Sequence, residues 1–462
     1  MGIDLVVYGA TGFTGRLVAA YLRRNVPSHN FTWALAGRSQ AKLQAIATNI
    51  EEDFLKTDTN NNKGCPPCQI LDGCTADDKG AQRIIKGLQP TVVISTAGPF
   101  VHFSNALVAA CAAAGVSYVD INGEIPWVKR VIDQHDATAK STGALIVPCS
   151  GFDSVPSDLG AMLACKQLAL KAPDQKCVAV HGVMHWGGGA TMSGGTIETG
   201  LIMKDLFPDE LRNPFLLGGA EKLDRGPTSP MDADVVEARY DGTLRRWLAP
   251  FGMAKINTRI VRRSAGPELS AYANICPERF CYREEMLVAV GGGKMAAKMA
   301  RNAAITPDSL RKLRAAGRLP TPGNGPSAHR RQKSSFQCIS TATSTDGKTR
   351  HSISISGGDP GYNETAKMVA ESALCILLED RASLPAAAGG GDRGKNNNNN
   401  GGGGVLTPSA AFGNVLVKRL TRAGMQFDMD FQTAQLPGEP DLDEEKKNPT
   451  ATTSTPAFMS KL

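Results

Sequence analysis

The chain has 462 residues, 42% of them hydrophobic and 21% charged, which is typical of a soluble globular protein with two or three domains and excludes a disordered or fibrous chain. Its formal charge of +7 is too small for this length to indicate nucleic-acid binding, and no nucleic-acid-binding motif supports that function. No run of about 18 apolar residues is present, so we expect no membrane-spanning helix.

Short apolar segments alternate with helical patterns over the first 150 residues. The predicted strands cover residues 3–8, 31–36, 69–71, 91–95, 117–121 and 144–147, and the predicted helices cover residues 16–24, 41–50, 81–88, 105–114 and 128–140. Residues 51–66 are polar and predict a loop insertion. Strands and helices that alternate at this spacing predict βαβ units in a doubly wound parallel sheet, with a ligand at the carboxyl ends of the strands.

A glycine-rich segment, Gly-Ala-Thr-Gly-Phe-Thr-Gly, lies between the first predicted strand and the first predicted helix. This order is typical of a dinucleotide site, although the GxxGxxG spacing differs from GxGxxG. The glycines permit a tight turn and close approach to a pyrophosphate, and the helix N-terminus favours phosphate. The expected contacts are Gly9, Thr11, Gly12, Phe13, Thr14 and Gly15. The alternative is a purely structural glycine turn.

The end of the second strand distinguishes NAD from NADP. An acidic residue there would bind the ribose hydroxyls of NAD, but this chain has Arg38 and Ser39. Arg38 can stack on adenine and pair with a 2′-phosphate, to which Ser39 can donate a hydrogen bond, so we predict NADP(H). Further contacts are expected from Asp72, after the third strand, and from Ala97, Gly98 and Pro99, after the fourth. The alternatives are a solvated arginine and plain turns.

The second half of the chain is less regular. Strand-like pieces at residues 178–184 and 256–261, a helical pattern at 196–206, an alternating strand at 351–356 and an amphipathic helix at 366–378 predict an α+β domain. We divide the chain into a Rossmann-type NADP-binding domain (1–150), an α+β domain that covers cofactor and substrate (151–385), a low-complexity linker (386–404), a returning C-terminal helix (405–430) and a disordered tail (431–462).

Residues 294–333 contain ten Lys or Arg and one acidic residue, Asp308. Such a region can contact membrane lipids or the phosphates of an acyl-CoA, and the alternative is a solvated basic loop.

No metal site is expected. Cys65, Cys68 and Cys74 lack a fourth ligand nearby, and His181 and His185 share one face of a predicted strand, where a core or pocket role is favoured. Apolar segments surround Cys111, Cys149, Cys165 and Cys375, which are expected to be buried, reduced thiols of an intracellular protein.

The chain ends in Ser460-Lys461-Leu462, which is a peroxisomal address read by an import receptor. The segment before it is poor in large apolar residues, so we expect an accessible tail and a location in the peroxisome or its specialised form, the glycosome. The alternative is a chance tripeptide.

Several motifs together resemble the saccharopine dehydrogenase-like oxidoreductase family. They are GATGFTG (9–15), AGRS (36–39), STAGPF (95–100), YVDINGE (118–124), SGFDSVPSDLG (150–160) and GVLTP (404–408). The resemblance implies a Rossmann domain, an inserted domain over the cofactor and a C-terminal helix that returns to the first domain. It is greatest to the lipid-linked branch, which includes the trans-acting enoyl reductases. Family members in animals are associated with lipid droplets, mitochondria and membranes, which are the alternative locations.

Candidate catalytic residues lie near the carboxyl end of the fifth strand. Asp120, with Tyr118, is the candidate for substrate positioning or proton relay, and Glu124 faces the same expected crevice. A carboxylate that caps the next helix is the alternative for Asp120, and Asp153 is expected to be a hinge or a cap between the domains.

The resemblance implies an NADP(H)-dependent reductase that acts on a C=C or C=N bond of a lipid or acyl intermediate, as in glycolipid synthesis. One rival is a saccharopine-type imine reductase, which would need a pair of arginines for a dicarboxylic substrate. Another is a non-catalytic NADP-binding scaffold associated with lipid. The oligomeric state is not predicted.

Overall fold

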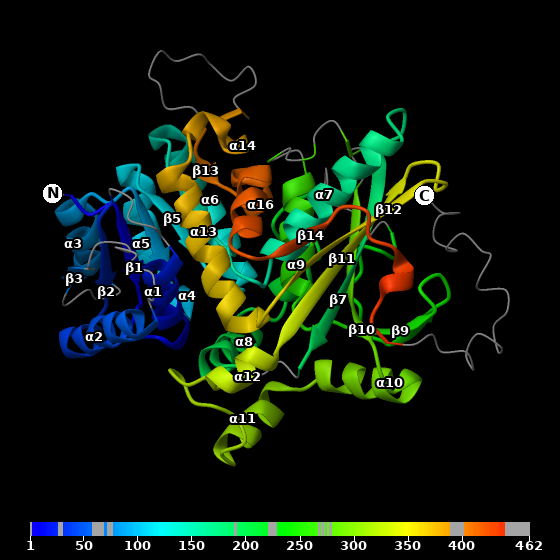
Figure 1. Ribbon diagram of the computed structural model, residues 1–462, viewed down its shortest axis with the longest axis horizontal. Coiled ribbons are helices and arrows are strands. Elements are labelled where there is room, and N and C mark those ends of the chain that lie inside the picture. Colours follow the sequence, from blue (N-terminus) through cyan, green and yellow to red (C-terminus); the bar gives the residue numbers. More distant parts are fainter. Residues whose placement is uncertain are drawn as a thin grey trace.

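The computed structural model describes residues 2–25, 31–57, 69–71, 77–188, 192–219, 229–266, 280–388 and 402–438, together with Leu269, Tyr272, Ile275 and Cys276. Two seven-stranded sheets lie side by side, with helices packed on and between them (Figure 1).

The first sheet is built from parallel strands. In spatial order they are β13 (Gly404–Val405), β6 (Leu145–Val147), β5 (Ser117–Asp120), β4 (Val92–Ser95), β1 (Leu5–Tyr8), β2 (Trp33–Ala36) and β3 (Gln69–Leu71). Leu5 pairs with Trp33 on one side and with Val92 on the other. The order 6-5-4-1-2-3 is that of a Rossmann-type sheet, which confirms the predicted fold class. The added strand β13 was not predicted.

Helices cover both faces of this sheet (Figure 1). One face carries α1 (Phe13–Asn25), α2 (Gln40–Thr57) and α13 (Thr365–Leu378), and the other carries α3 (Asp78–Leu88), α5 (Asn105–Ala114) and α6 (Ile125–Thr142). Alternate residues of β1 explain this arrangement, because Leu5 and Val7 pack in the first of these cores and Val6 and Tyr8 in the second.

The helix α2 is longer than predicted. Residues 51–57 were expected in a loop but form its last turns. Phe54 continues the buried stripe of Leu43 and Ile46, and Glu51 forms an ion pair with Arg23 of α1 at 2.7 Å. The polar residues of this stretch therefore lie on the solvent-exposed face of a helix and not in a loop. The rest of the predicted insertion, residues 58–66, lies outside the described part of the chain.

The second sheet is mixed. In spatial order its strands are β14 (Gln426–Asp428), β12 (Arg350–Gly357), β11 (Ser335–Ser344), β7 (Cys177–Gly187), β10 (Cys281–Val288), β9 (Arg246–Pro250) and β8 (Arg239–Asp241). β7 and β10 run parallel, and the other neighbours run antiparallel. The long helix α7 (Val155–Lys171) packs on β7, β11 and β12 and is buried along most of its length.

Residues 256–261, predicted as a strand, lie in helix α9 (Ala254–Ala265), so that prediction is wrong. Isoleucine and valine favour a strand locally. In the structure, Arg259, Arg262 and Arg263 are buried on this helix and hydrogen-bond to backbone carbonyls of distant segments. These tertiary contacts override the local preference.

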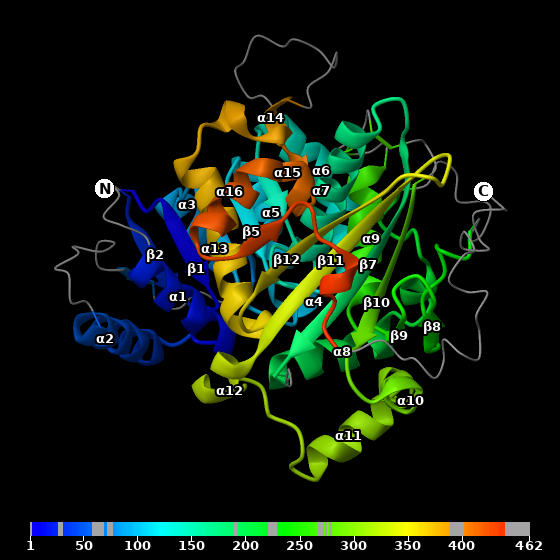
Figure 2. The ribbon, with the colours of Figure 1, turned by 45° about the vertical axis from the view of Figure 1, so that its right-hand side comes forward.

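Most of the basic region is helical and not a loop, and it is largely exposed, so solvation stays the alternative to a lipid contact. It forms α10 (Gly292–Ala303), α11 (Pro307–Ala315) and α12 (Ala328–Lys333), which lie at one edge of the molecule in both views (Figures 1 and 2). Only Ala296 is buried on these three helices.

The C-terminal segment returns to the first sheet, as predicted. Beyond β13, helix α15 (Pro408–Ala411) contacts α7 and β6, and α16 (Gly413–Arg422) packs on α13, which in turn contacts α1. The remaining helices are α4 (Phe100–Phe103), α8 (Gly194–Leu206) and α14 (Pro385–Ala388). Within the described residues, no helix combines the length and apolar character needed to cross a membrane. The division into domains stays a prediction.

Candidate functional site

The glycine turn is packed too tightly to accept side chains at two of its positions. Gly9 has a φ of +80°, and a Cβ there would lie 2.8 Å from the backbone nitrogen of Ala97. A Cβ on Gly15 would lie 2.5 Å from the carbonyl oxygen of Gly9. The turn after β1 therefore lies directly against the loop after β4, and these two predicted cofactor segments are neighbours.

The N-terminus of α1 presents backbone donors. The first N–H of α1 that bonds to a carbonyl is that of Arg16, which donates to Gly12 at 3.1 Å. The N–H groups of Phe13, Thr14 and Gly15 donate to no described residue. Such donors, together with the positive end of the helix dipole, suit a pyrophosphate. This geometry fits the phosphates of a dinucleotide.

Arg38 and Ser39 lie where β2 ends and α2 begins. Arg38 is exposed, its guanidinium carbon lies 5.5 Å from the centre of the Phe103 ring, and it forms no ion pair within the described residues. The carbonyl of Ser39 accepts the first hydrogen bond of α2, from Leu43. A cation without a protein partner beside an aromatic ring can hold a 2′-phosphate and an adenine. Asp72 lies outside the described residues.

Glu124 fixes the loop that contains Ala97, Gly98 and Pro99. It is fully buried and accepts hydrogen bonds from the N–H groups of Phe100 and Val101, both at 2.8 Å. It also accepts one from the hydroxyl of Thr199 on α8, at 3.3 Å. Burial raises the pKa of Glu124. The sequence predicts Glu124 near the crevice, and the structure shows in addition that it accepts a hydrogen bond from α8.

Tyr118 and Asp120 are both fully buried in β5. Asp120 accepts hydrogen bonds from the N–H and side-chain amide of Asn122 and from the N–H of Cys149, and burial raises its pKa to about 7. It does not cap α6, which begins at Ile125, so the capping alternative is wrong. Cys149 is buried, as expected, and burial raises its pKa. Asp120 therefore orders the loops after β5 and β6, and its predicted role in substrate positioning stays a prediction.

A cleft with a volume of about 90 Å³, partly open to solvent, lies between the two sheets at this end of β5. Its walls come from the start of α1, the loops after β5 and β6, the end of β7 and the turn Pro360–Glu364. Most of the lining is apolar or aromatic, as at Ile121, Phe152, Trp186 and Met253. No lysine, arginine or histidine lines it within the described residues. Neither Tyr118 nor Asp120 is among the lining residues.

Asp153 is the one acidic residue that lines this cleft in the described part of the chain. It is partly exposed to the cleft and forms no hydrogen bond to a described residue. Burial raises its pKa to about 7. Asp153 therefore combines access, an unused hydrogen-bonding capacity and a pKa near neutrality, as a proton donor requires. In the sequence, Asp153 lies in the segment that crosses between the domains, and the sequence predicts a hinge or a cap at this position.

Tyr362 was not found by sequence reasoning. It lies in the turn after β12, its ring packs edge-on against Phe13 at 5.0 Å, and its hydroxyl accepts a hydrogen bond from the N–H of Ser193. The turn is also tied to the cleft floor, because the N–H of Phe152 donates to the hydroxyl of Thr365 at 3.2 Å. These contacts join the glycine turn, the cleft and α8.

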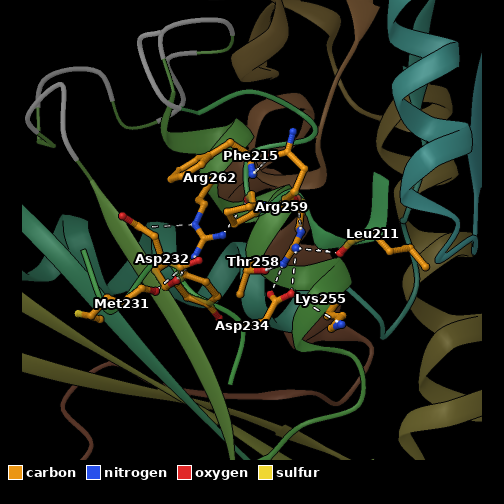
Figure 3. Close-up of polar contacts among 12 residues, drawn as sticks. Leu211, Phe215, Met231, Asp232, Asp234, Lys255, Thr258, Arg259 and Arg262 are labelled. Atoms are coloured by element: carbon orange, nitrogen blue, oxygen red, sulfur yellow. Dashed lines mark hydrogen bonds and ion pairs between the residues drawn. The ribbon is translucent and has the colours of Figure 1, made fainter. Parts of the chain in front are cut away.

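Two arginines near the second sheet form ion pairs and hydrogen bonds with other groups of the protein. Figure 3 shows Arg259 paired with Asp234 and Arg262 beside Asp232. Arg259 also donates to the carbonyls of residues 211 and 213, and Arg262 to those of residues 214, 231, 232 and 282. Burial lowers the pKa of Arg262 to about 10. These guanidinium groups stabilise the fold around α9 and are not available to a dicarboxylate.

His181 and His185 lie on β7, as predicted. His181 contacts Glu285 at 2.9 Å. Burial lowers the pKa of His185.

The chain is similar to several known proteins. Residues 5–147 match the model of the saccharopine dehydrogenase NADP binding domain. The chain is 34% identical over 460 residues to a putative trans-acting enoyl reductase of Mycobacterium tuberculosis, covering 94% of this chain and 98% of the relative. It is 29% identical over 451 residues to a trans-acting enoyl reductase of Mycobacterium bovis, covering 91% and 96%. The structure of saccharopine dehydrogenase from Saccharomyces cerevisiae aligns with a TM-score of 0.47 at 12% identity, covering 92% of this chain and 99% of that one.

Proposed function

Because this chain belongs to the saccharopine dehydrogenase-like family of NADP-binding oxidoreductases, we propose that it uses NADPH to reduce a carbon–carbon double bond in an acyl or other lipid intermediate. Two relatives that align with more than 90% of the chain are named a putative trans-acting enoyl reductase and a trans-acting enoyl reductase. The fold and the donors of the glycine turn support the cofactor, and the chemistry of the cleft supports the substrate class.

The observation that carries this proposal is the lining of the cleft, whose described residues are mostly apolar and include one carboxyl group, that of Asp153. An apolar lining favours an apolar substrate, because burial of a charged substrate without a partner is costly. A saccharopine-type substrate carries several carboxylates and requires arginines, and none of the described residues that line the cleft is an arginine. Arg259 and Arg262 cannot supply them, because both are buried, pair with groups of the protein and do not line the cleft.

Different residues bind the cofactor, donate the proton and exclude water. The backbone donors of α1 and the guanidinium of Arg38 hold the dinucleotide, which supplies the hydride when bound. Asp153 donates a proton to the carbon next to the one that receives the hydride, becomes a carboxylate, and regains its proton from solvent through the open side of the cleft. Apolar side chains such as Trp186 and Phe152 exclude water from the reacting atoms.

The test is NADPH oxidation with a panel of 2-enoyl thioesters and their free acids, beside aminoadipate semialdehyde with glutamate. Turnover of enoyl substrates that falls in the Asp153→Asn variant is expected. Turnover of the semialdehyde with glutamate alone would favour the imine reductase. NADPH binding without any turnover would favour the scaffold.

A lipid surface is the partner that we propose for the basic helices. On α10, Lys294, Lys298 and Arg301 are exposed, and Val290 and Met295 are 79% and 39% exposed beside them. Exposed basic and apolar side chains that lie close together on and just before one helix suit an anionic membrane or droplet surface. Co-sedimentation with anionic liposomes should be lost when the three basic residues are replaced by glutamine. Sedimentation that is unchanged in this variant would refute the contact.

We also propose import into peroxisomes or glycosomes through Ser460-Lys461-Leu462, which lie outside the described residues. A fluorescent protein fused to residues 451–462 should enter the organelle, and the same fusion without Leu462 should not. Diffuse fluorescence from the complete tail would refute the address.

A further inference from the structure

Three buried cysteines converge where α7, β7 and the segment before β10 meet. Cys165 lies on α7, Cys177 is the first residue of β7, and Cys276 precedes β10. The sulfur of Cys165 is 3.3 Å from that of Cys177 and 3.8 Å from that of Cys276, and all three lie within 4.8 Å of one another. Their exposed fractions are 0%, 1% and 6%.

We propose that these three sulfurs form a binding site for one soft, thiophilic metal ion. A trigonal ion with metal–sulfur bonds of about 2.3 Å holds its ligands about 4 Å apart, which is close to the spacing found here. The sulfurs therefore need only a small outward movement to surround an ion. This is the one place in the described residues where three such ligand atoms lie so close.

The chemistry of the ligands identifies the class of ion. Thiolates are soft ligands that select Cu(I) or Zn²⁺ over Mg²⁺ and Ca²⁺. Structural Zn²⁺ takes four protein ligands, whereas the described residues provide three here. Three coordinating thiolates without a fourth ligand fit Cu(I) best.

Binding is a ligand exchange without electron transfer. As many as three thiol protons pass to solvent, and three sulfur–metal bonds form. Desolvation opposes buried thiolates, so the positive charge of the ion compensates for their burial.

The ion would join three separate segments of the second sheet region. Cys177 starts the strand that pairs with both β10 and β11, and Cys165 lies on the helix that packs on this sheet. None of the three cysteines lines the cleft. The site is therefore a structural clamp that is independent of the proposed reduction.

The test is an anaerobic titration of the reduced full-length protein with Cu(I) in competition with bicinchoninate, with Zn²⁺ in a parallel arm. Cys65, Cys68 and Cys74 are replaced by alanine in every sample, so that these other cysteines cannot bind the ion. We expect one tightly held equivalent of Cu(I), and an affinity about 100-fold lower or worse in the Cys177→Ala variant. The matched control is Cys111→Ala, which removes a buried cysteine from α5 and should leave binding unchanged.

X-ray absorption of the Cu(I)-loaded protein provides a test that does not depend on the folding of a variant. Three sulfur neighbours near 2.3 Å would support the site, and a nitrogen or oxygen ligand set would overturn it. No Cu(I) uptake by the reduced protein, binding that persists in Cys177→Ala, or four-coordinate Zn²⁺ held more tightly than Cu(I) would each overturn the proposal as stated. A Cys165–Cys177 disulfide that persists under reducing conditions would overturn it as well.

Discussion

Replacing Asp153 with asparagine removes the acidic group from the cleft while it keeps the shape of the side chain. With a pKa of about 7, about half of the Asp153 side chains carry a proton at pH 7. A carboxyl group with the ordinary value of 3.8 would be protonated in under about 0.1% of molecules at this pH. Burial thus increases the acid form by a factor of several hundred. A positioned general acid contributes about 10²- to 10⁴-fold to the rate, so we expect kcat to fall by this factor in Asp153→Asn.

Single-turnover kinetics with NADPH and an enoyl substrate would measure this effect. The wild-type rate should fall as pH rises above about 7, because the acid form is lost, and the variant should show no such titration. NADPH affinity, measured by fluorescence, should be equal in both proteins. The exposed carboxylate Asp133, replaced in the same way, should leave both rate and pH profile unchanged.

The pH dependence of the free energy of unfolding provides a second test, because the raised pKa of Asp153 determines its direction. The folded-state pKa of Asp153 lies above its unfolded value, so the folded protein binds the proton more tightly than the unfolded chain does. Wild-type stability should therefore decrease, relative to Asp153→Asn, as pH rises from about 4 to about 7. A rate in Asp153→Asn within about twofold of wild type, with an unchanged pH profile, would refute the assignment of Asp153 as the acid.

Three further variants test the cofactor site and the fold. Arg38→Ala should weaken NADPH binding about 10- to 100-fold and NADH binding much less, because the charge-assisted pair to the 2′-phosphate is lost only with NADPH; equal losses for both, in thermal-shift titrations, would contradict that role. Gly15→Ala should destabilise the protein by about 1–3 kcal/mol in denaturant unfolding, since the new methyl group meets the backbone of Gly9, and unchanged stability would mean that the turn can relax. Arg259→Met should cost about 3–5 kcal/mol because it removes the buried partner of Asp234, and a neutral result would show that Lys255 and solvent satisfy that carboxylate.

Local sequence patterns predicted the first sheet well. Its strands are short apolar runs bounded by turns, and its helices carry clear buried stripes, so both signals lie within about ten residues of the chain. The same reasoning failed at residues 256–261, where isoleucine and valine suggested a strand. The helix there is held by Arg259 and Arg262, whose partners lie about 20 to 50 residues away.

Some residues of the candidate site could also be predicted from local sequence, and others could not. The glycine turn and Arg38 could be found in the sequence, because a strand, a turn and a helix follow one another along the chain. The place of Asp153 in the cleft could not, because its surroundings come from β7 and from the turn that contains Tyr362, about 210 residues later. A short polar motif does not indicate whether its carboxyl group will cap a helix, lie in solvent or line a cleft.

The sequence by itself determined the alternation of strands and helices in the Rossmann-type domain, the position of the dinucleotide turn and the family to which the chain belongs, since each of these depends on residues that are close together in the chain. Only the tertiary structure decided that β13 completes this sheet, that the cleft is apolar with one carboxyl group, and that three cysteines meet beneath α7. These features arise where segments far apart in the chain pack together, and the burial that gives Asp153 its raised pKa exists only after that packing.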